Sequence, residues 1–240
     1  MSGSSPGLLP FPTSPLLTVC AQNSQSQRIL WLLEELEIPY NLELHQRVEQ
    51  RSPPALKQTH PLGKAPQLET GDGRVIAESV VIAKYLIDTY DKAGKFKGDG
   101  SAKNDTLRDE QLCNLAAASL GPVMLVDLIL LFASKMTPFF VRWLMALVHS
   151  QIRNQFSGPE LALYYRYLDD QLEGQDYFMG NTAPARADFI LSYPVDQCVA
   201  ANMVDLTKYP RLEKWHARIH ERPAWKRSLE KGNGYNLGLN

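Results

Sequence analysis

The stretch Gly63-Lys64-Ala65-Pro66-Gln67-Leu68-Glu69 carries the clearest local signal in the chain. Only X-Pro bonds adopt the cis form at modest cost, so the bond before Pro66 is a candidate cis bond leading into a short strand. A cis bond here would turn the backbone N–H and C=O of Ala65 outward, where they can pair with an extended backbone. Lys64 beside it suits a carboxylate. The stretch therefore predicts a contact site for a peptide-like ligand.

Two further signals follow this stretch: Asp72-Gly73 is a hairpin turn signal, and Glu78-Ser79 opens an apolar helix. A carboxylate and a hydroxyl at a helix N-terminus suit the charged head group of an α-amino acid. Together the segments predict a compact site for a peptide-like ligand with charge at both ends. The alternative, from these residues alone, is a proline-bounded hairpin followed by an ordinary helix cap.

Composition and charge limit the functions open to the chain. Of its 240 residues 44% are apolar and 21% are charged, which is typical of a globular protein with one large or two small domains. The formal net charge of -1 gives no electrostatic reason to expect a nucleic acid partner. Cys20, Cys113 and Cys198 are far apart and form no CxxC motif, which favours a reducing compartment, and we expect the cytoplasm.

Hydrophobic periodicity predicts a small α/β module at the start of the chain. The expected elements are a strand at 15–20, a helix through Ile29–Leu36, a half-buried strand from Tyr40, an irregular helical stretch at 51–58, strands at 65–69 and 75–76, and a helix at 78–90. Their order is β-α-β-α-β-β-α, and the right-handed crossover rule makes the first half a parallel βαβ unit. Beyond the module the pattern is helical, which predicts an all-helical second domain.

We accordingly expect a flexible N-terminal arm at 1–14, an α/β domain at 15–91, a linker at 92–102 and a helical domain at 103–240. The most apolar region, residues 120–148, is interrupted by charged residues and a proline. We therefore expect buried helices there and no membrane span, and we leave association with a membrane surface open.

Several motifs occur in the order and at the spacing of one known family. They are Ser24-x-x-x-Arg28, Trp31-Leu-Leu-Glu-Glu-Leu36, His60-Pro-Leu-Gly-Lys-Ala-Pro66, Glu78-Ser79, the segment from Lys135 to Phe139, and Ala187-Asp188. From about residue 15 to residue 230 the chain resembles a cytosolic-type glutathione S-transferase, closest to the fungal branch that includes the yeast microsome-associated glutathione transferase. The resemblance implies a thioredoxin-like N-terminal domain that holds glutathione and an all-α C-terminal domain that walls an electrophile pocket.

The resemblance also implies roles for individual residues of the glutathione site. The main chain of Ala65, before cis-Pro66, would pair with the cysteinyl part of glutathione. Glu78 and Ser79 would take the γ-glutamyl ammonium and carboxylate. Lys64, with Arg51 as a weaker candidate, would face the glycine carboxylate. For Gln67 a place near the tripeptide and a place on the strand surface both stay open.

The expected chemistry depends on where the glutathione thiol sits. At the N-terminus of the first helix, orphan N–H groups and the helix dipole favour an anion, and a hydroxyl that donates a hydrogen bond lowers the pKa of the thiol further. Ser24 is the first candidate for this donor, Asn23 the second and Ser26 the third. The alternative for Ser24 is a simple helix N-cap.

The predicted function is therefore glutathione transfer to apolar electrophiles, with glutathione-dependent peroxidase activity as a companion. The alternative is a glutathione-binding or ligand-carrying protein with little turnover, because fold does not imply function. Family resemblance suggests a homodimer. Apolar segments at 120–124 and at Phe139-Phe140 are candidate walls of the electrophile pocket.

We expect structural roles for the cysteine in the first strand and for the histidines. Cys20 lies within the predicted first strand, so a core cysteine is the expected reading. We recognise no HExxH motif and no paired spacing among the five histidines, and we therefore predict no metal site. Ala185 stands three residues before Asp188, where relatives carry Ser or Thr, so the helix is expected to begin without a side-chain cap.

Overall fold

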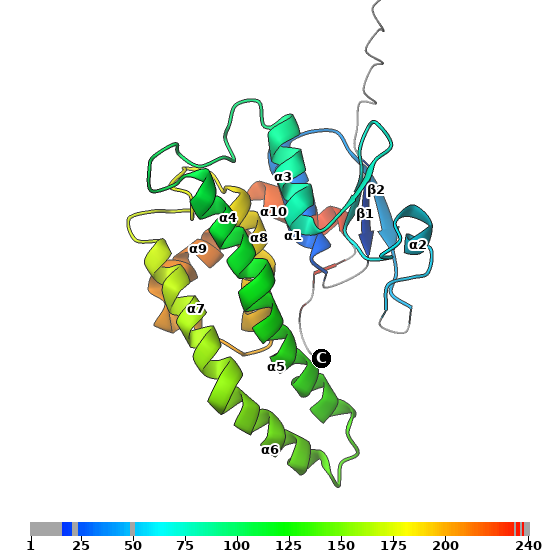
Figure 1. Ribbon diagram of the computed structural model, residues 1–240, viewed down its shortest axis with the longest axis vertical. Coiled ribbons are helices and arrows are strands. Elements are labelled where there is room, and N and C mark those ends of the chain that lie inside the picture. The colour runs from blue at the N-terminus through cyan, green and yellow to red at the C-terminus, as the bar shows by residue number, and fades with distance from the viewer. Residues whose placement is uncertain (1–15, 21–23, 49–50, 233, 236, 238–240) are drawn as a thin grey trace, which may run out of the picture.

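The computed structural model describes residues 16–20, 24–48, 51–232, 234–235 and 237, with only the backbone for 16–20. A small α/β domain stands beside a larger helical domain (Figure 1). The arm expected at 1–14 lies outside the described residues.

The N-terminal domain has the predicted order β-α-β-α-β-β-α. Its elements are β1 (Leu16–Cys20), α1 (Ser26–Leu36), β2 (Asn41–His45), α2 (Leu56–Thr59), β3 (Gln67–Glu69), β4 (Val75–Ala77) and α3 (Ser79–Tyr90). The sheet order is β2-β1-β3-β4, with β1 parallel to β2 and antiparallel to β3, and with β3 antiparallel to β4. The predicted parallel βαβ unit and the thioredoxin-like fold are thus confirmed. Gly73 occupies the β3–β4 turn with φ 82°, a conformation that glycine adopts without steric cost.

The regular elements of the second domain are all helices within its described residues, as predicted. Its elements are α4 (Thr106–Asn114), η1 (Leu115–Leu120), α5 (Gly121–Met136), α6 (Arg142–Ile152), η2 (Arg153–Ser157), α7 (Gly158–Gln171), α8 (Arg186–Ala200), η3 (Leu206–Lys208), α9 (Pro210–Glu221) and α10 (Pro223–Lys231). The π-helical turns η1 and η2 each stand immediately before a Gly-Pro pair, at 121–122 and 158–159. Because proline cannot donate a backbone hydrogen bond, a local change of helical hydrogen bonding at these points has a direct cause.

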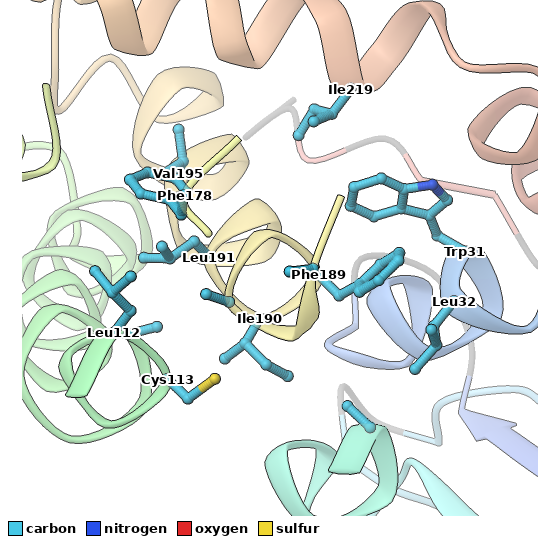
Figure 2. Close-up of a cluster of buried hydrophobic side chains, with 14 of the residues drawn as sticks. Trp31, Leu32, Leu112, Cys113, Phe178, Phe189, Ile190, Leu191, Val195 and Ile219 are labelled. Carbon is cyan, nitrogen blue, oxygen red and sulfur yellow. The ribbon is translucent and has the colours of Figure 1, made fainter. Parts of the chain in front are cut away.

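The core joins the two domains through α1 and α8. Trp31 of α1 packs edge-to-face on Phe189 of α8, with ring centroids 4.5 Å apart, and on Trp225 of α10 at 5.2 Å. Figure 2 shows Trp31 next to Phe189, with Ile190 and Leu191 continuing the cluster toward α4. The two domains therefore share one hydrophobic core and do not bury separate ones.

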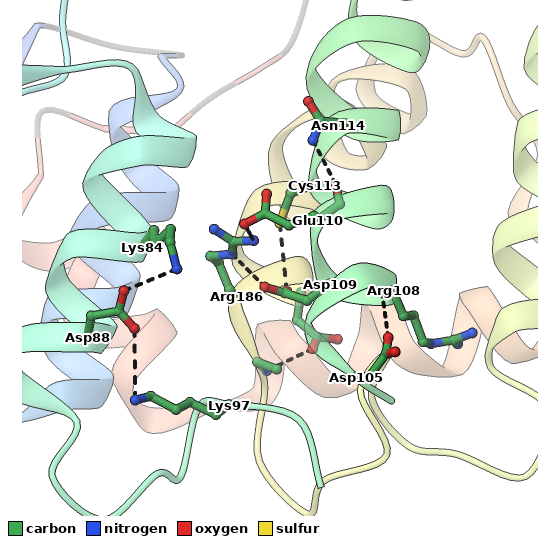
Figure 3. A network of polar contacts seen from close by, with 12 residues as sticks. Lys84, Asp88, Lys97, Asp105, Arg108, Asp109, Glu110, Cys113, Asn114 and Arg186 are labelled. Carbon is green, nitrogen blue, oxygen red and sulfur yellow. Dashed lines mark hydrogen bonds and ion pairs between the residues drawn. The ribbon is translucent and has the colours of Figure 1, made fainter. Parts of the chain in front are cut away.

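A polar network crosses the helical domain next to this core. Arg186, at the start of α8, pairs with Asp109 at 2.7 Å and with Glu110 at 2.8 Å, both on α4 (Figure 3). Burial raises the pKa of Asp109, and the Arg186 guanidinium opposes that shift. Across from it, Asp88 of α3 pairs with Lys84 of the same helix at 3.1 Å.

The start of α8 depends on one buried carboxylate. Ala185 supplies no side-chain cap, as expected. The Asp188 carboxylate instead accepts a hydrogen bond from the backbone N–H of Ala185 at 2.8 Å and another from the backbone N–H of Phe178 at 3.2 Å. The indole Nε1–H of Trp215 donates to the same carboxylate at 2.7 Å. Asp188 thus ties α8, α9 and the loop before α8 together at one buried point.

The prediction that the apolar region 120–148 is buried is wrong for its distal part. No residue of α6 is buried, and Met136, Phe139 and Trp143 are 86%, 83% and 67% exposed. The helix through Thr106–Met136 is long and apolar enough to cross a membrane on length and composition. Its Asp127, however, is fully buried and accepts a hydrogen bond from Ser157 at 2.7 Å, as expected of a helix within a folded domain. Residues 129–148, none of which is buried, are called the distal hairpin below.

Replacing Asp188 with alanine should lower the free energy of unfolding by at least about 3 kcal/mol, because three buried N–H donors lose their acceptor. Urea denaturation followed by circular dichroism measures this loss. Asp205→Ala is the matched control, since Asp205 is an exposed acceptor for Thr207 at η3, and its loss should cost less than about 1 kcal/mol. Equal effects of the two substitutions would contradict the role assigned to Asp188.

Candidate active site

A cavity of about 340 Å³ lies between the two domains. One end is polar and comes from the N-terminal turns of α1 and α3. The opposite wall is apolar and comes from η1 and α5, with α8 closing one side. The lining residues are Gln25, Arg28, Glu78, Ser79, Val80, Ala116, Ala117, Gly121, Pro122, Met124, Leu125, Leu128, Tyr193 and Pro194. A charged ligand would suit the polar end of the cavity, and an apolar second molecule would suit the opposite wall.

Arg28 supplies a buried positive charge at the polar end. Its guanidinium donates to the carbonyl of Ile190 at 2.9 Å and to the side chains of Gln25 and Ser79, and it lies 5.9 Å from the ring centre of Tyr193. Burial lowers the pKa of Arg28 to about 10, so the group remains a cation at neutral pH. The charge is not balanced by a described carboxylate within ion-pair distance, so this end of the cavity favours an anion.

Glu78 and Ser79 meet at the start of α3, as the sequence predicted. Glu78 is the N-cap residue with φ 68° and ψ 111°, and its side chain is exposed, whereas Ser79 is buried. A non-glycine residue at positive φ is uncommon, and such residues are concentrated at functional sites. This turn places a carboxylate and a hydroxyl side by side on the cavity lining, next to Arg28.

The three candidates for the thiol-activating donor have different surroundings. Ser24 is half-buried, and its Oγ accepts the backbone N–H of Ser26 at 3.2 Å, a contact typical of a helix start. A hydroxyl that accepts a hydrogen bond still carries a proton that it can donate. Ser26 is fully buried, and its Oγ has no hydrogen-bond partner within the described part of the chain. Asn23 lies outside the described residues.

The loop before β3 contains the expected cis bond between Ala65 and Pro66. Gln67 holds this loop: its side-chain amide donates to the carbonyls of Lys64 at 2.9 Å and Leu56 at 3.1 Å. Gln67 is only 1% exposed, so its alternative interpretation as a strand-surface residue is wrong.

The remaining predicted glutathione contacts are not part of the cavity lining. Lys64 and Arg51 are exposed, and the backbone of Arg51 forms an isolated bridge with Val48. The structure thus brings Glu78 and Ser79 together in the cavity, while Arg51, Lys64, Ala65 and Pro66 lie outside its lining.

Gln25, Arg28 and Tyr193 are among the lining residues that sequence reasoning did not assign to the site. Arg28 entered the sequence analysis only as part of the Ser24-x-x-x-Arg28 motif. Its spacing of three residues from Gln25 places both side chains at the first turn of α1, and this spacing could have identified them as neighbours in the site. Tyr193 comes from α8 and no local pattern connects it to α1. Of the predicted pocket walls, 120–124 contributes Gly121, Pro122 and Met124. Phe139-Phe140 was a wrong prediction, because both side chains lie in the distal hairpin, 83% and 65% exposed.

The described cysteine side chains do not offer a reactive thiolate. Cys113 and Cys198 are buried and unpaired. Burial raises the pKa of Cys113 far above its ordinary value and that of Cys198 to about 12. The nucleophile of any reaction in this cavity must therefore come from a ligand or from a different residue type.

The prediction that the histidines have no paired spacing is wrong. His216 and His220 are four residues apart on α9, a paired spacing that the sequence prediction overlooked, and both face Asp196 of α8. This cluster is separate from the cavity described above, with which it shares no lining residue.

Comparisons with known proteins agree with the fold. Residues 24–89 match the family model "Glutathione S-transferase, N-terminal domain", and residues 142–232 match "Glutathione S-transferase, C-terminal domain". Glutathione S-transferase 3 of Schizosaccharomyces pombe is 30% identical over 218 residues, which are 91% of this chain and 88% of the relative. Glutathione S-transferase 1 of Saccharomyces cerevisiae is 26% identical over 228 residues, 91% of this chain and 94% of the relative.

A solved structure shows the same overall arrangement. The crystal structure of a glutathione S-transferase from Actinobacillus pleuropneumoniae has a TM-score of 0.71 and 28% identity, and the similarity covers 93% of this chain and 95% of that one. With two matched domain models in the expected order and curated fungal relatives along most of its length, the chain belongs to the glutathione S-transferase family, as its sequence motifs predicted.

Proposed function

We propose that the chain conjugates glutathione to apolar electrophiles in the cavity between its domains. The observation that carries this proposal is the division of the cavity: a buried guanidinium, Glu78 and Ser79 form one end, and η1 and α5 form an apolar wall opposite. A peptide thiol with a charged head group suits the first part, and an apolar electrophile suits the second.

The γ-glutamyl end of glutathione binds at the start of α3. The Glu78 carboxylate takes the ammonium group, and the Ser79 hydroxyl takes the carboxylate, with the positive charge of Arg28 beneath them. The main chain of Ala65, before cis-Pro66, pairs with the cysteinyl residue. Lys64 lies toward the glycine carboxylate, with Arg51 as a weaker candidate. This assignment leaves the thiol near the N-terminus of α1.

Thiol activation follows from that position. The N-terminus of α1 favours a thiolate, and the Ser24 hydroxyl donates a hydrogen bond to it, with Asn23 and Ser26 as the second and third candidates. The full burial of Ser26 supports its lower rank. The thiolate sulfur then forms a bond to the electrophilic carbon, and either the leaving group departs with its electron pair or a conjugate addition takes up a proton.

Two further functions are compatible with the same site. A glutathione-dependent peroxidase would use the same thiolate to attack a hydroperoxide oxygen. A carrier or regulatory protein would bind glutathione with little turnover. Turnover with a small aromatic halide, measured beside calorimetric binding of reduced glutathione, separates the carrier from the enzyme. We place the function in a reducing compartment, the cytoplasm, in agreement with the two described cysteines being unpaired.

Ser24→Ala should lower kcat/KM for conjugation by about 10- to 100-fold, the equivalent of one hydrogen bond to a charged group. Glutathione affinity, measured by isothermal titration, should change little, because the thiol contributes less to binding than the charged head group. The pKa of the bound thiol, read from thiolate absorbance against pH, should rise. Ser150→Ala is the control and should leave the rate unchanged, because Ser150 is exposed on α6 and does not line the cavity. A Ser24→Ala enzyme with an unchanged rate would remove Ser24 from the mechanism.

Glu78→Gln should weaken glutathione binding by about 10- to 100-fold, because a charge-assisted contact to the ammonium is lost while the side-chain shape is kept. The control is Glu69→Gln, since Glu69 is exposed on β3 and does not line the cavity. Isothermal titration gives both dissociation constants. Equal affinities in the two variants would overturn the placement of the head group at α3.

We further propose that the protein is a homodimer in which a second copy covers part of the distal hairpin. Monomeric proteins rarely expose large contiguous apolar patches, so a surface rich in exposed apolar side chains usually marks an interaction site. Trp143→Glu with Leu147→Glu should shift the mass measured by light scattering from dimer to monomer, whereas Leu107→Glu, at an exposed position of α4, should not. A monomeric wild-type protein that sediments with lipid vesicles would assign the surface to membrane association and reject the dimer.

A further inference from the structure

Helices α8 and α9 present three metal-ligating side chains to one another, outside the lining of the candidate active site. His216 and His220 are four residues apart, so they lie on one face of α9, and that face meets Asp196. Nε2 of His216 lies 2.7 Å and Nε2 of His220 lies 3.2 Å from the same oxygen, Oδ1 of Asp196. The three ligand atoms lie within 4.8 Å of one another.

The cluster combines a buried carboxylate with accessible imidazoles. The side chain of Asp196 is 4% exposed, whereas those of His216 and His220 are 19% and 30% exposed. Their ring edges border a cavity of about 270 Å³ that is also lined by Val199, Ala200 and Leu237. An ion can therefore reach the nitrogen atoms from solvent without opening the core.

The second oxygen of Asp196 is oriented from outside the cluster. The hydroxyl of Tyr235, in the C-terminal segment, donates to Oδ2 at 2.8 Å. This leaves Oδ1 directed at the two imidazoles. A ligating carboxylate held by a further hydrogen bond is the usual arrangement around protein-bound metals, because that bond fixes its orientation.

We propose that Asp196, His216 and His220 form a binding site for a divalent transition-metal ion of the zinc or nickel type. Two nitrogens and one carboxylate oxygen are ligands that such ions prefer, and His residues at i and i+4 of a helix can reach one ion. Ligands about 2.0 Å from a tetrahedral ion are separated by roughly 3.3 Å, close to the nitrogen–oxygen distances seen here.

Binding requires a change of protonation and little change of position. In the ion-free cluster the imidazole Nε2–H groups donate to Asp196. When the ion takes up the Nε2 lone pairs, a neutral ring moves its proton from Nε2 to Nδ1 by exchange with solvent. A doubly protonated ring keeps its Nδ1 proton and releases its Nε2 proton to solvent. No oxidant or reductant is involved. The fourth position on the ion faces the 270 Å³ cavity and takes a water molecule.

A second histidine–carboxylate contact, between His149 and Asp127, is not suited to bind a metal ion and serves as a comparison. Asp127 pairs with His149 at 3.3 Å, but its other oxygen is bonded by Arg153, whose fixed positive charge opposes a cation. Only one imidazole approaches that carboxylate among the described residues. The site at Asp196 differs in offering two imidazoles without a bound guanidinium.

The bound ion would connect three segments that are distant in sequence. Asp196 belongs to α8, the histidines belong to α9, and Tyr235 holds the carboxylate from the C-terminal segment. The inference does not depend on the proposed function, since the cluster shares no lining residue with the cavity between the domains. Its expected effect is on stability and not on conjugation.

The test uses tag-free, full-length protein treated with EDTA and then titrated with Zn²⁺ and Ni²⁺ by calorimetry. We expect saturable binding of one ion per chain, with affinity at least tenfold lower in His216→Ala and in His220→Ala and unchanged in the control His149→Ala. Zn²⁺ should raise the melting temperature of wild type and His149→Ala only. Absence of saturable binding, or equal affinity in the double variant His216→Ala/His220→Ala, would overturn the proposal.

A second measurement needs no variant and so does not depend on folding of the substituted chains. Diethylpyrocarbonate modifies accessible imidazoles, and peptide mass spectrometry locates the modified residues. Zn²⁺ should slow modification of His216 and His220 at least fivefold and leave His60 unaffected. Equal modification rates with and without Zn²⁺ would show that the three side chains are only hydrogen-bonded to one another, and would overturn the proposed metal site. Conjugation measured beside these titrations distinguishes failure of this site from failure of the transferase proposal.

Discussion

The packing of α1 between the sheet and the helical domain is the constraint on which the rest of the structure depends. Every residue from Ser26 to Glu35 is buried, so this helix has no solvent face over most of its length. Trp31 contacts Phe189 of α8 and Trp225 of α10, which fixes the rotation of α1 about its axis. A buried aromatic cluster of this kind contributes through both apolar area and ring geometry.

The packing of α1 determines which residues surround each of its two ends. At its C-terminal end, Glu34 pairs with Arg227 at 2.9 Å and with Lys231, while Glu35 accepts from Arg222 at 2.8 Å, so α10 is bound to α1 by charge as well as by apolar contact. Burial alone would raise the pKa of Glu34, but hydrogen bonds from Lys231, Tyr40 and Arg227 lower it. Removing the basic partners would leave a buried carboxylate without a counter-charge.

At its N-terminal end, the same helix brings Arg28 against α8 and α3. The guanidinium bonds to the Ile190 carbonyl and the Ser79 hydroxyl, so the polar end of the active-site cavity is built from the domain junction itself. The proposed glutathione site is therefore coupled to core packing, and changes in the core at Phe189 are expected to be transmitted to it. The histidine–aspartate cluster lies farther along α8, where a bound ion would hold the C-terminal elements against the same helix.

The sequence by itself determined the element order, the turn at Asp72-Gly73 and the adjacency of Glu78 and Ser79, because each depends on periodicity or on neighbours within a few residues. It marked the bond before Pro66 as a candidate cis bond, and it indicated the family through the order and spacing of motifs along the chain. Only the tertiary structure decided which side chains meet across the chain. It placed Tyr193 beside Arg28, buried Gln67, left Phe139 in solvent and brought Asp196 to His216 and His220. These contacts join residues on different elements, and local pattern carries no information about how two amphipathic helices dock.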